Sequence, residues 1–176
     1  MSVQTGGFVD VAARARELGC RVPVGIALLP GNFATAANSD EFCYDAATPH
    51  IRSAWQSIGL EDEGPGSESG IRDLGLGASP GIPTQAPSAS VKVPLVVFFG
   101  ADLLAGPAWR VTVALGMVSS VLASRSRQSS RGDVRVDVVV ERPGDRRCVC
   151  IEYQGDAFGI IALAREVRRI WPNSQG

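Results

Sequence analysis

Apolar and polar residues alternate most regularly in the last third of the chain. In residues 134–141 the valines at 134, 136 and 138 face one way, and a second alternating run covers 147–153. The residues between them, 142–146, read Arg-Pro-Gly-Asp-Arg, which is typical of a turn. Two alternating runs joined by such a turn predict an antiparallel β-hairpin.

Three apolar segments surround this hairpin. Residues 91–99 form a continuous apolar run, which predicts a central strand, and a helix with few polar faces is expected from Pro107 to about Ser124. Asp156 can cap a last helix whose core-facing residues are Ile160, Leu163, Ala164, Val167 and Trp171. The order strand, helix, strand, strand, helix predicts a small sheet with both helices on one face. We expect the α/β class, with α+β as the alternative.

The first half contains weaker signals. Apolar spacing predicts a helix over 8–18 that ends at Gly19, and 22–29 is a short apolar run typical of a strand. Asn38 and Glu41 resemble a capping box for a short helix reaching Ala47. Thr48, as N-cap before Pro49, predicts a further helix that ends at Gly59.

Residues 59–90 interrupt these patterns. They are rich in Gly, Pro, Ser and acidic side chains and contain neither an aromatic residue nor a cysteine. Such a segment buries too little apolar surface to offset the entropy of ordering its backbone. We therefore expect an N-terminal α/β segment over 1–58, a flexible linker or loop over 59–90, and a core over 91–176. The two outer segments are expected to form one bipartite domain.

Charge is distributed unevenly along the chain. Five arginines and ten acidic residues give residues 1–90 a formal charge of −5, whereas eleven arginines, one lysine and eight acidic residues give residues 91–176 a charge of +4. A charge of +4 is below that of a typical nucleic-acid-binding domain, so no nucleic-acid partner is expected. The preference for arginine over lysine, with much Ala, Gly and Val, indicates a bacterial origin.

The same sequence features bear on location. The N-terminus lacks the basic start and apolar core of a signal peptide, and the most apolar segment, 111–123, is too short to span a bilayer. We expect a cytoplasmic protein with no membrane contact, whose cysteines are reduced.

Cysteine and histidine residues are candidate metal ligands or catalytic groups. Cys148 and Cys150 lie on a predicted strand, and Cys43 and His50 lie in the first half, so four soft ligands are present. A straight strand curls poorly around zinc, so we interpret Cys148 and Cys150 as small core residues. His50 could act in a triad with Cys43 or a serine and with Asp45 or Asp40, but it is more simply a surface residue. No metal, cofactor or catalytic residue is predicted.

Two turns that follow predicted strands are candidate ligand sites. Asn32 lies in the turn after the strand ending at Leu29, and Gly100 and Asp102 lie in the turn after Phe99. Ligands of α/β sheets often bind at the carboxyl ends of strands. Neither turn has the glycine spacing of a phosphate loop, and Asp102 could instead cap a helix. The basic, serine-rich run at 124–131 is interpreted as a solvated connector.

Two functional hypotheses follow. The first, which we prefer, is a non-enzymatic interaction or accessory protein of a bacterial complex, for example a stress or defence assembly. Its partner would be another protein or a second copy, and its aromatic anchors would be Phe33, Trp55 and Trp109, unless these residues belong to the core. The alternative is a regulatory domain or weak hydrolase that binds a small molecule or nucleotide through Asn32, Gly100 and Asp102.

Overall fold

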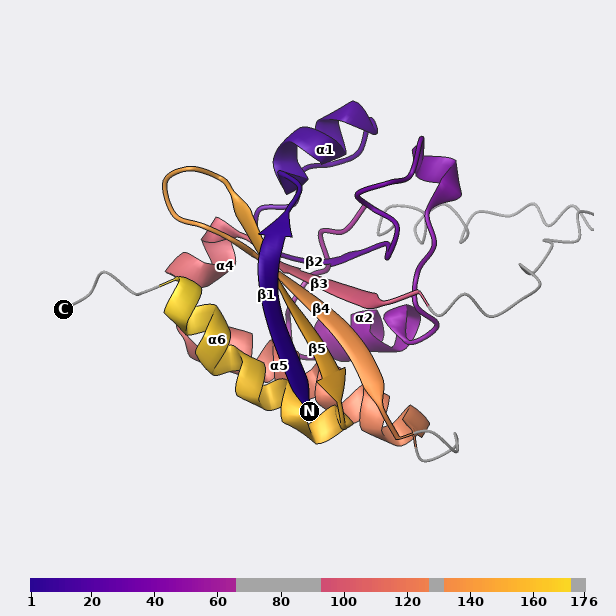
Figure 1. The fold of residues 1–176 in the computed structure, drawn as a ribbon, viewed down its shortest axis with the longest axis vertical. Helices are drawn as coiled ribbons and strands as arrows, with labels where there is room; N and C mark the ends of the chain where they lie inside the picture. Colours follow the sequence, from indigo (N-terminus) through magenta and orange to yellow (C-terminus); the bar gives the residue numbers. More distant parts are fainter. Residues whose placement is uncertain (66–92, 127–131, 172–176) are drawn as a thin grey trace, which may run out of the picture.

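A five-stranded mixed sheet organises the protein, with the strand order β1-β5-β4-β3-β2 (Figure 1). The structure is a computed structural model, and it describes residues 1–65, 93–126 and 132–171. Only β3 and β4 are parallel, while the other neighbouring strands are antiparallel. Helices accompany the sheet, so the expected α/β class is confirmed. Both halves of the sequence contribute strands to this one sheet.

The predicted hairpin is confirmed. Strands β4 (Val134–Glu141) and β5 (Cys148–Gly155) pair antiparallel, and Val138 lies opposite Ile151. The turn between them is closed by the Arg142 amide, which donates to the Arg147 carbonyl at 2.8 Å. The central strand β3 (Leu95–Phe99) is buried along its whole length, as its continuous apolar sequence predicts.

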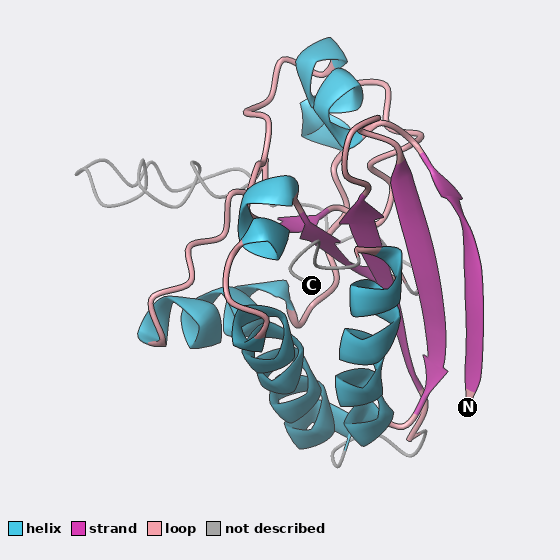
Figure 2. Ribbon diagram, turned by 90° about the vertical axis from the view of Figure 1, so that its left-hand side faces the viewer, coloured by secondary structure: helices cyan, strands magenta, loops and turns pink. Residues whose placement is uncertain are grey.

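Helices cover one face of the sheet (Figure 2). They are α2 (Thr48–Ser57), α5 (Trp109–Ser126), the 3₁₀ helix η2 (Ala157–Ala162) and α6 (Leu163–Ile170). Their apolar side chains form the larger core with the inward-facing residues of the strands. The Trp55 indole Nε1 of α2 donates to the Ala114 carbonyl of α5 at 3.1 Å. This buried bond satisfies the indole N–H, which needs an acceptor in the core. It also joins the two halves of the sequence.

The other face of the sheet is covered mainly at one end. Helix α1 (Val11–Glu17) lies there, where its Val11 and Ala15 pack in a smaller core with Phe33 and the buried thiols of Cys148 and Cys150. The Asp10 carboxylate accepts from the Ala13 amide at 2.9 Å and so caps α1. In Figure 1 the lower parts of β1, β5 and β4 carry no helix on this face.

Several element boundaries differ from the sequence predictions. Residues 2–8 form a strand, β1 (Ser2–Phe8), and α1 begins only at Val11. Strand β2 covers only Ile26–Leu29 of the predicted run, and a short helix, α4 (Ala101–Ala105), precedes α5.

Two helix starts also differ. Asn38 caps a single 3₁₀ turn, η1 (Ser39–Glu41), and its side chain accepts from the nearby Asp40 amide. The predicted helix to Ala47 does not form. The N-cap of α2 is Ala47 instead of Thr48, and the Asp45 carboxylate accepts from the Ala47 amide at 2.7 Å.

The sheet has two edge strands that differ in how their outer sides are satisfied. Along β2, residues 62–64 follow the strand: Ile26 and Asp62 form an isolated bridge, and the Glu63 amide donates to the Ile26 carbonyl at 2.9 Å. Along β1, the described residues provide a partner only on the inner side, where β5 lies. Within the described residues, one edge is therefore closed and the other has no partner on its outer side.

Residues 59–65, the beginning of the tract predicted to be a linker, are part of this packing. Gly59 ends α2 with φ of 76°, and Leu60 is buried in the larger core. The remainder of the tract, 66–90, lies outside the described residues. No helix of the described ranges is long and apolar enough to cross a membrane.

Candidate functional site

The candidate site begins with the geometry of η2, which exposes two large apolar side chains. A 3₁₀ helix has three residues per turn, so side chains three apart lie on the same side. Ala157 and Ile160 accordingly face the core, while Phe158 and Ile161 face solvent with exposed fractions of 66% and 45%. The sequence did not single out Phe158, because its neighbours fit the 3.6-residue spacing of an α-helix. The sequence signal for this pair is two large apolar residues spaced i, i+3 directly after a predicted strand.

Tyr153 holds η2 close to the sheet. Its hydroxyl donates to the Asp156 carbonyl at 2.7 Å, and the Asp156 carboxylate accepts from the Gly159 amide at 2.9 Å. A Cβ atom at Gly159 would lie 2.0 Å from the Tyr153 hydroxyl oxygen. Gly159 is therefore required for this close approach, which fixes the position of Phe158 and Ile161.

A groove lies between η2 and α5. Its volume is about 270 Å³, and Phe158 and Ile161 form one wall. Small residues of α5 form the rest of the lining, namely Gly116, Ser119, Ser120, Ala123 and Ser124. Because these side chains are short, the backbone of α5 lies near the surface, and an approaching side chain can enter the groove. The site is a mixed apolar and hydroxyl surface without a large cavity.

Of the three aromatic residues considered from the sequence, one is exposed. Phe33 and Trp55 are only 1% and 0% exposed, and they take the alternative role of core residues. Trp109 is 57% exposed at the first position of α5. Helical spacing puts Trp109, Val113, Gly116 and Ser120 on one stripe of α5, so Trp109 lies about two turns along the helix from the groove.

Several arginines lie on α5 and α6. Arg165 follows Ile161 by one turn, Arg110 and Arg125 flank the two ends of α5, and all three are exposed. The Arg168 guanidinium donates to the Ala108 carbonyl at 3.3 Å and to the Thr112 hydroxyl at 3.2 Å, so it spans α6 and α5. The Glu166 carboxylate is paired with Arg169 at 2.9 Å. The exposed Asp156 carboxylate, the N-cap of η2, also belongs to these surroundings, in which Arg165 and Arg168 give a small excess of positive charge.

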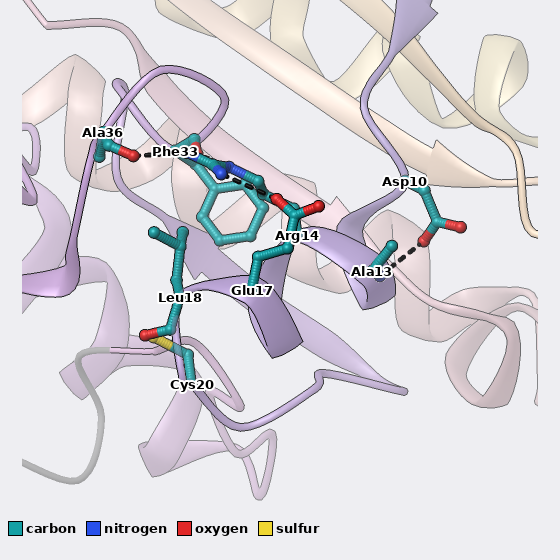
Figure 3. A network of polar contacts seen from close by, with 8 residues as sticks. All are labelled: Asp10, Ala13, Arg14, Glu17, Leu18, Cys20, Phe33 and Ala36. Carbon is teal, nitrogen blue, oxygen red and sulfur yellow. Dashed lines mark hydrogen bonds and ion pairs between the residues drawn. The ribbon is translucent and has the colours of Figure 1, made fainter.

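The turn that contains Asn32 is held by its own polar groups. The Asn32 side chain donates to the Glu41 carbonyl at 2.7 Å and accepts from the Cys43 amide at 2.9 Å. Figure 3 shows how Arg14 of α1 reaches the same turn. Its guanidinium donates to the Phe33 carbonyl at 3.3 Å and to the Ala36 carbonyl. These hydrogen bonds occupy the polar groups of the turn and hold the loop in place.

The other predicted ligand turn lies at the opposite end of the sheet. Strands β2 and β3 are antiparallel, with Ile26 opposite Phe99, so the segments after Leu29 and after Phe99 leave the sheet in opposite directions. A Cβ atom at Gly100 would lie 2.3 Å from the Val24 carbonyl oxygen, and the Asp102 amide donates to that carbonyl at 3.0 Å. Asn32 and Asp102 therefore cannot contact one small ligand, and ligand binding at either turn stays a prediction.

The cysteine and histidine residues do not come together. Cys43 and His50 are exposed, whereas Cys148 and Cys150 are buried in the smaller core. In the described ranges, no three His, Cys, Asp or Glu side chains lie close enough to hold a metal ion. Burial raises the pKa of Cys148 to about 11 and that of Cys150 to about 12, so both thiols are protonated at neutral pH.

One nearly buried carboxylate occupies the middle of the sheet. Asp137 of β4 is 9% exposed, and its register partner on β5 is Glu152. Arg135 lies 3.7 Å from an oxygen of each carboxylate. Burial raises the pKa of Asp137, the Arg135 charge lowers it, and the Glu152 charge raises it further. This pair has an electrostatic cost, because like charges directly opposite each other destabilise a sheet.

Comparisons with known protein families, curated proteins and solved structures gave no match to this chain.

Proposed function

We propose that this protein is a non-enzymatic interaction module of a bacterial cytoplasmic complex, and that it binds an amphipathic helix with acidic side chains. The single observation behind this proposal is the groove between α5 and η2, where Phe158 and Ile161 stand exposed beside small residues. Binding of an apolar helix face in a groove is a common mode of recognition between proteins.

Energetic considerations favour an apolar partner face. Full burial of an exposed Phe or Ile side chain contributes roughly 1.5–3 kcal/mol, so Phe158 and Ile161 could anchor a complex. Gly116 and Ala123 leave room for side chains of the partner. Trp109 extends the surface along α5, and exposed tryptophan is frequent among the residues that dominate binding energies.

The charge around the groove favours acidic side chains on the polar face of the partner. Arg165 and Arg168 of α6 are exposed beside η2, where they outnumber the Asp156 carboxylate, while Glu166 is paired with Arg169. Acidic side chains beside the apolar face of a partner helix would meet these arginines. Such rim charges contribute mainly to association rate and specificity, so the binding should weaken as salt is raised.

Fluorescence anisotropy with labelled helical peptides of about 20 residues tests this proposal. Two peptides share one apolar face and carry either glutamates or lysines on the polar face. We expect the acidic peptide to bind at least about tenfold more tightly than the basic one, with a difference that narrows at high salt. Equal affinity for both peptides, or binding of neither, would contradict the proposal.

Matched variants locate the binding surface. The double variant Phe158→Ala/Ile161→Ala should lose at least about tenfold in affinity for the acidic peptide. Val24→Ala is the control, because Val24 is 48% exposed beside β2, away from the groove. Unchanged binding by the double variant would show that the peptide binds elsewhere.

A further inference from the structure

The open edge of the sheet supports an inference about a second surface, separate from the groove. Strand β1 has seven residues, Ser-Val-Gln-Thr-Gly-Gly-Phe, and all but Phe8 are exposed. Figure 2 shows β1 at the rim of the sheet, beside the N-terminus. Natural proteins usually protect such an edge with charged residues, proline or a bulge. Strand β1 contains no charged residue and no proline, and its register with β5 runs without a break from Ser2 to Phe8.

Two glycines in β1 have no explanation in the contacts of the described residues. A Cβ atom at Gly6 or Gly7 would meet nothing within 4 Å, and neither residue has a positive φ. By contrast, Gly64 and Gly100 pack against backbone at distances of 2.4 and 2.3 Å from an added Cβ. Glycine inside a strand lowers its stability and often marks a place where another backbone comes close. At Gly6 and Gly7 the described residues supply no such backbone.

We propose that the outer edge of β1 pairs antiparallel with β1 of a second copy, so that two sheets join into one. A two-fold axis at Thr5, the middle of the strand, uses all seven residues of both copies. In this register Val3 lies opposite Gly7 of the second copy, and Gln4 lies opposite Gly6. Ser2 lies opposite Phe8, so each larger side chain meets a smaller one. Thr5 meets Thr5, a favourable cross-strand pair.

This register also explains why the occupant is a second copy. The strand is its own complement, because the small residues at one end match the larger residues at the other. Since β1 is uncharged, the pairing brings no like charges together. The backbone groups on the outer edge gain partners in an extended ladder.

Sedimentation velocity on the full chain over a range of concentrations tests the proposal with a charge exchange. The variant Gln4→Lys/Gly6→Lys places lysine opposite lysine at two positions of the pairing, whereas Gln4→Lys/Gly6→Glu places lysine opposite glutamate. Both changes lie on an exposed strand with free space at residue 6. We expect the wild type to dimerise, the lysine variant to dimerise at least about tenfold more weakly, and the mixed variant to recover affinity.

A cross-linking measurement fixes the register independently of those variants. In a Cys43→Ser background, which removes the exposed thiol, Thr5→Cys should form a disulfide between copies on mild oxidation. Directly opposite residues in a sheet have the Cα separation that a disulfide needs. Ser2→Cys is the control, since its two copies would be about 20 Å apart in this register.

Three results would overturn the proposal. The first is a wild type that stays monomeric at the highest attainable concentration, which would leave the edge for a strand of another protein. The second is dimerisation of the lysine variant with wild-type affinity. The third is cross-linking by Ser2→Cys in place of Thr5→Cys. The groove proposal does not depend on these outcomes, because its test measures the loss of peptide binding in the Phe158→Ala/Ile161→Ala variant.

Discussion

The two edges of the sheet solve the same physical problem differently. Both leave a row of backbone amides and carbonyls on the outer side of a strand. On the β2 side, the Asp62 carboxylate accepts from the Leu28 amide at 2.8 Å, and the Glu63 carboxylate accepts from the Val24 and Gly25 amides at 2.7 and 2.8 Å. The β1 edge has no comparable cover from the described residues. The β2 edge is thus part of the fold, and the lack of such cover among the described residues is the basis for the proposed pairing through β1.

Buried carboxylates at the β2 edge and in the middle of the sheet also differ in how well they are satisfied. The Asp62 side chain is 1% exposed, and it also accepts from the Gly64 amide at 2.8 Å and pairs with Arg52 at 2.7 Å. Asp137 lies in β4, the middle strand of the sheet, where the described residues provide one oppositely charged partner, the Arg135 guanidinium at 3.7 Å. One Oδ atom of Asp137 is buried without a hydrogen bond. The β2 edge therefore satisfies its buried charge, whereas the middle of the sheet carries a charge that is poorly satisfied.

The largest effect is expected from breaking the closed edge. Asp62→Ala removes the acceptor of the Leu28 and Gly64 amides and leaves Arg52 without its partner. Loss of a buried, hydrogen-bonded charge should lower the free energy of unfolding by about 3 kcal/mol. Chemical denaturation measures this change. Glu61→Ala, one residue away and exposed, is the control and should change stability by less than about 0.5 kcal/mol. Equal effects of the two variants would show that Asp62 does not hold the edge.

A smaller change of opposite sign is expected at Asp137. Folding raises the pKa of this acid, so the folded protein binds its proton more tightly than the unfolded chain. Its favourable contribution is complete below the unfolded pKa, about 3.9, and is lost as pH rises through the folded-state pKa. Asp137→Asn removes the charge and should stabilise the protein by about 1 kcal/mol at pH 7.

The pH dependence of this gain is the sharper part of the test. Thermal melting from pH 7 down to pH 4 should show the advantage of Asp137→Asn shrinking as the wild-type carboxyl becomes protonated. Glu152→Gln, at a carboxylate that is about half exposed, should give a smaller gain. A destabilised Asp137→Asn variant at pH 7 would mean that Arg135 compensates the buried charge fully.

The thiols are expected to have the smallest effect on stability. Their alkylation rates report how well the surrounding structure shields each region from solvent. Cys43 is exposed in the loop beside β2, whereas Cys148 and Cys150 are buried, with pKa values of about 11 and about 12. Only thiolates react with iodoacetamide, so at pH 8 Cys43 should be alkylated at least about a hundredfold faster than either strand cysteine. Peptide mapping by mass spectrometry follows the three sites. Comparable rates at all three would show that the smaller core opens readily.

Much of the fold follows from local patterns, and the remainder depends on pairing. The β4–β5 hairpin and the helices α5 and α6 were predicted because period-2 and 3.6-residue patterns continue over seven residues or more. Strand β1 was not predicted, because Gly6 and Gly7 disfavour a strand locally and only pairing with β5 orders it. Residues 62–64 were assigned to a linker because the carboxylates that satisfy the β2 edge resemble a solvated acidic run in the sequence.

The candidate site was predictable in part. Trp109 was identified from its residue type, and it is exposed on the proposed surface. Phe158 and Ile161 were not identified, because the change from 3₁₀ to α geometry at Leu163 rotates them away from the buried face. Asn32 and Asp102 were predicted because each follows a strand, and the antiparallel pairing of β2 and β3 places their two turns at opposite ends of the sheet.

Hydrogen exchange of the two edge strands tests the central contrast most directly. In dilute solution, the amides of 26–29 in β2 should be protected on both sides of the strand. About half of the amides in 2–8 of β1 should exchange rapidly, because alternate residues of an edge strand direct their amides outward. Raising the protein concentration should slow this fast half and leave β2 unchanged. Complete protection of β1 in dilute solution, or rapid exchange along β2, would contradict the account of one closed and one open edge.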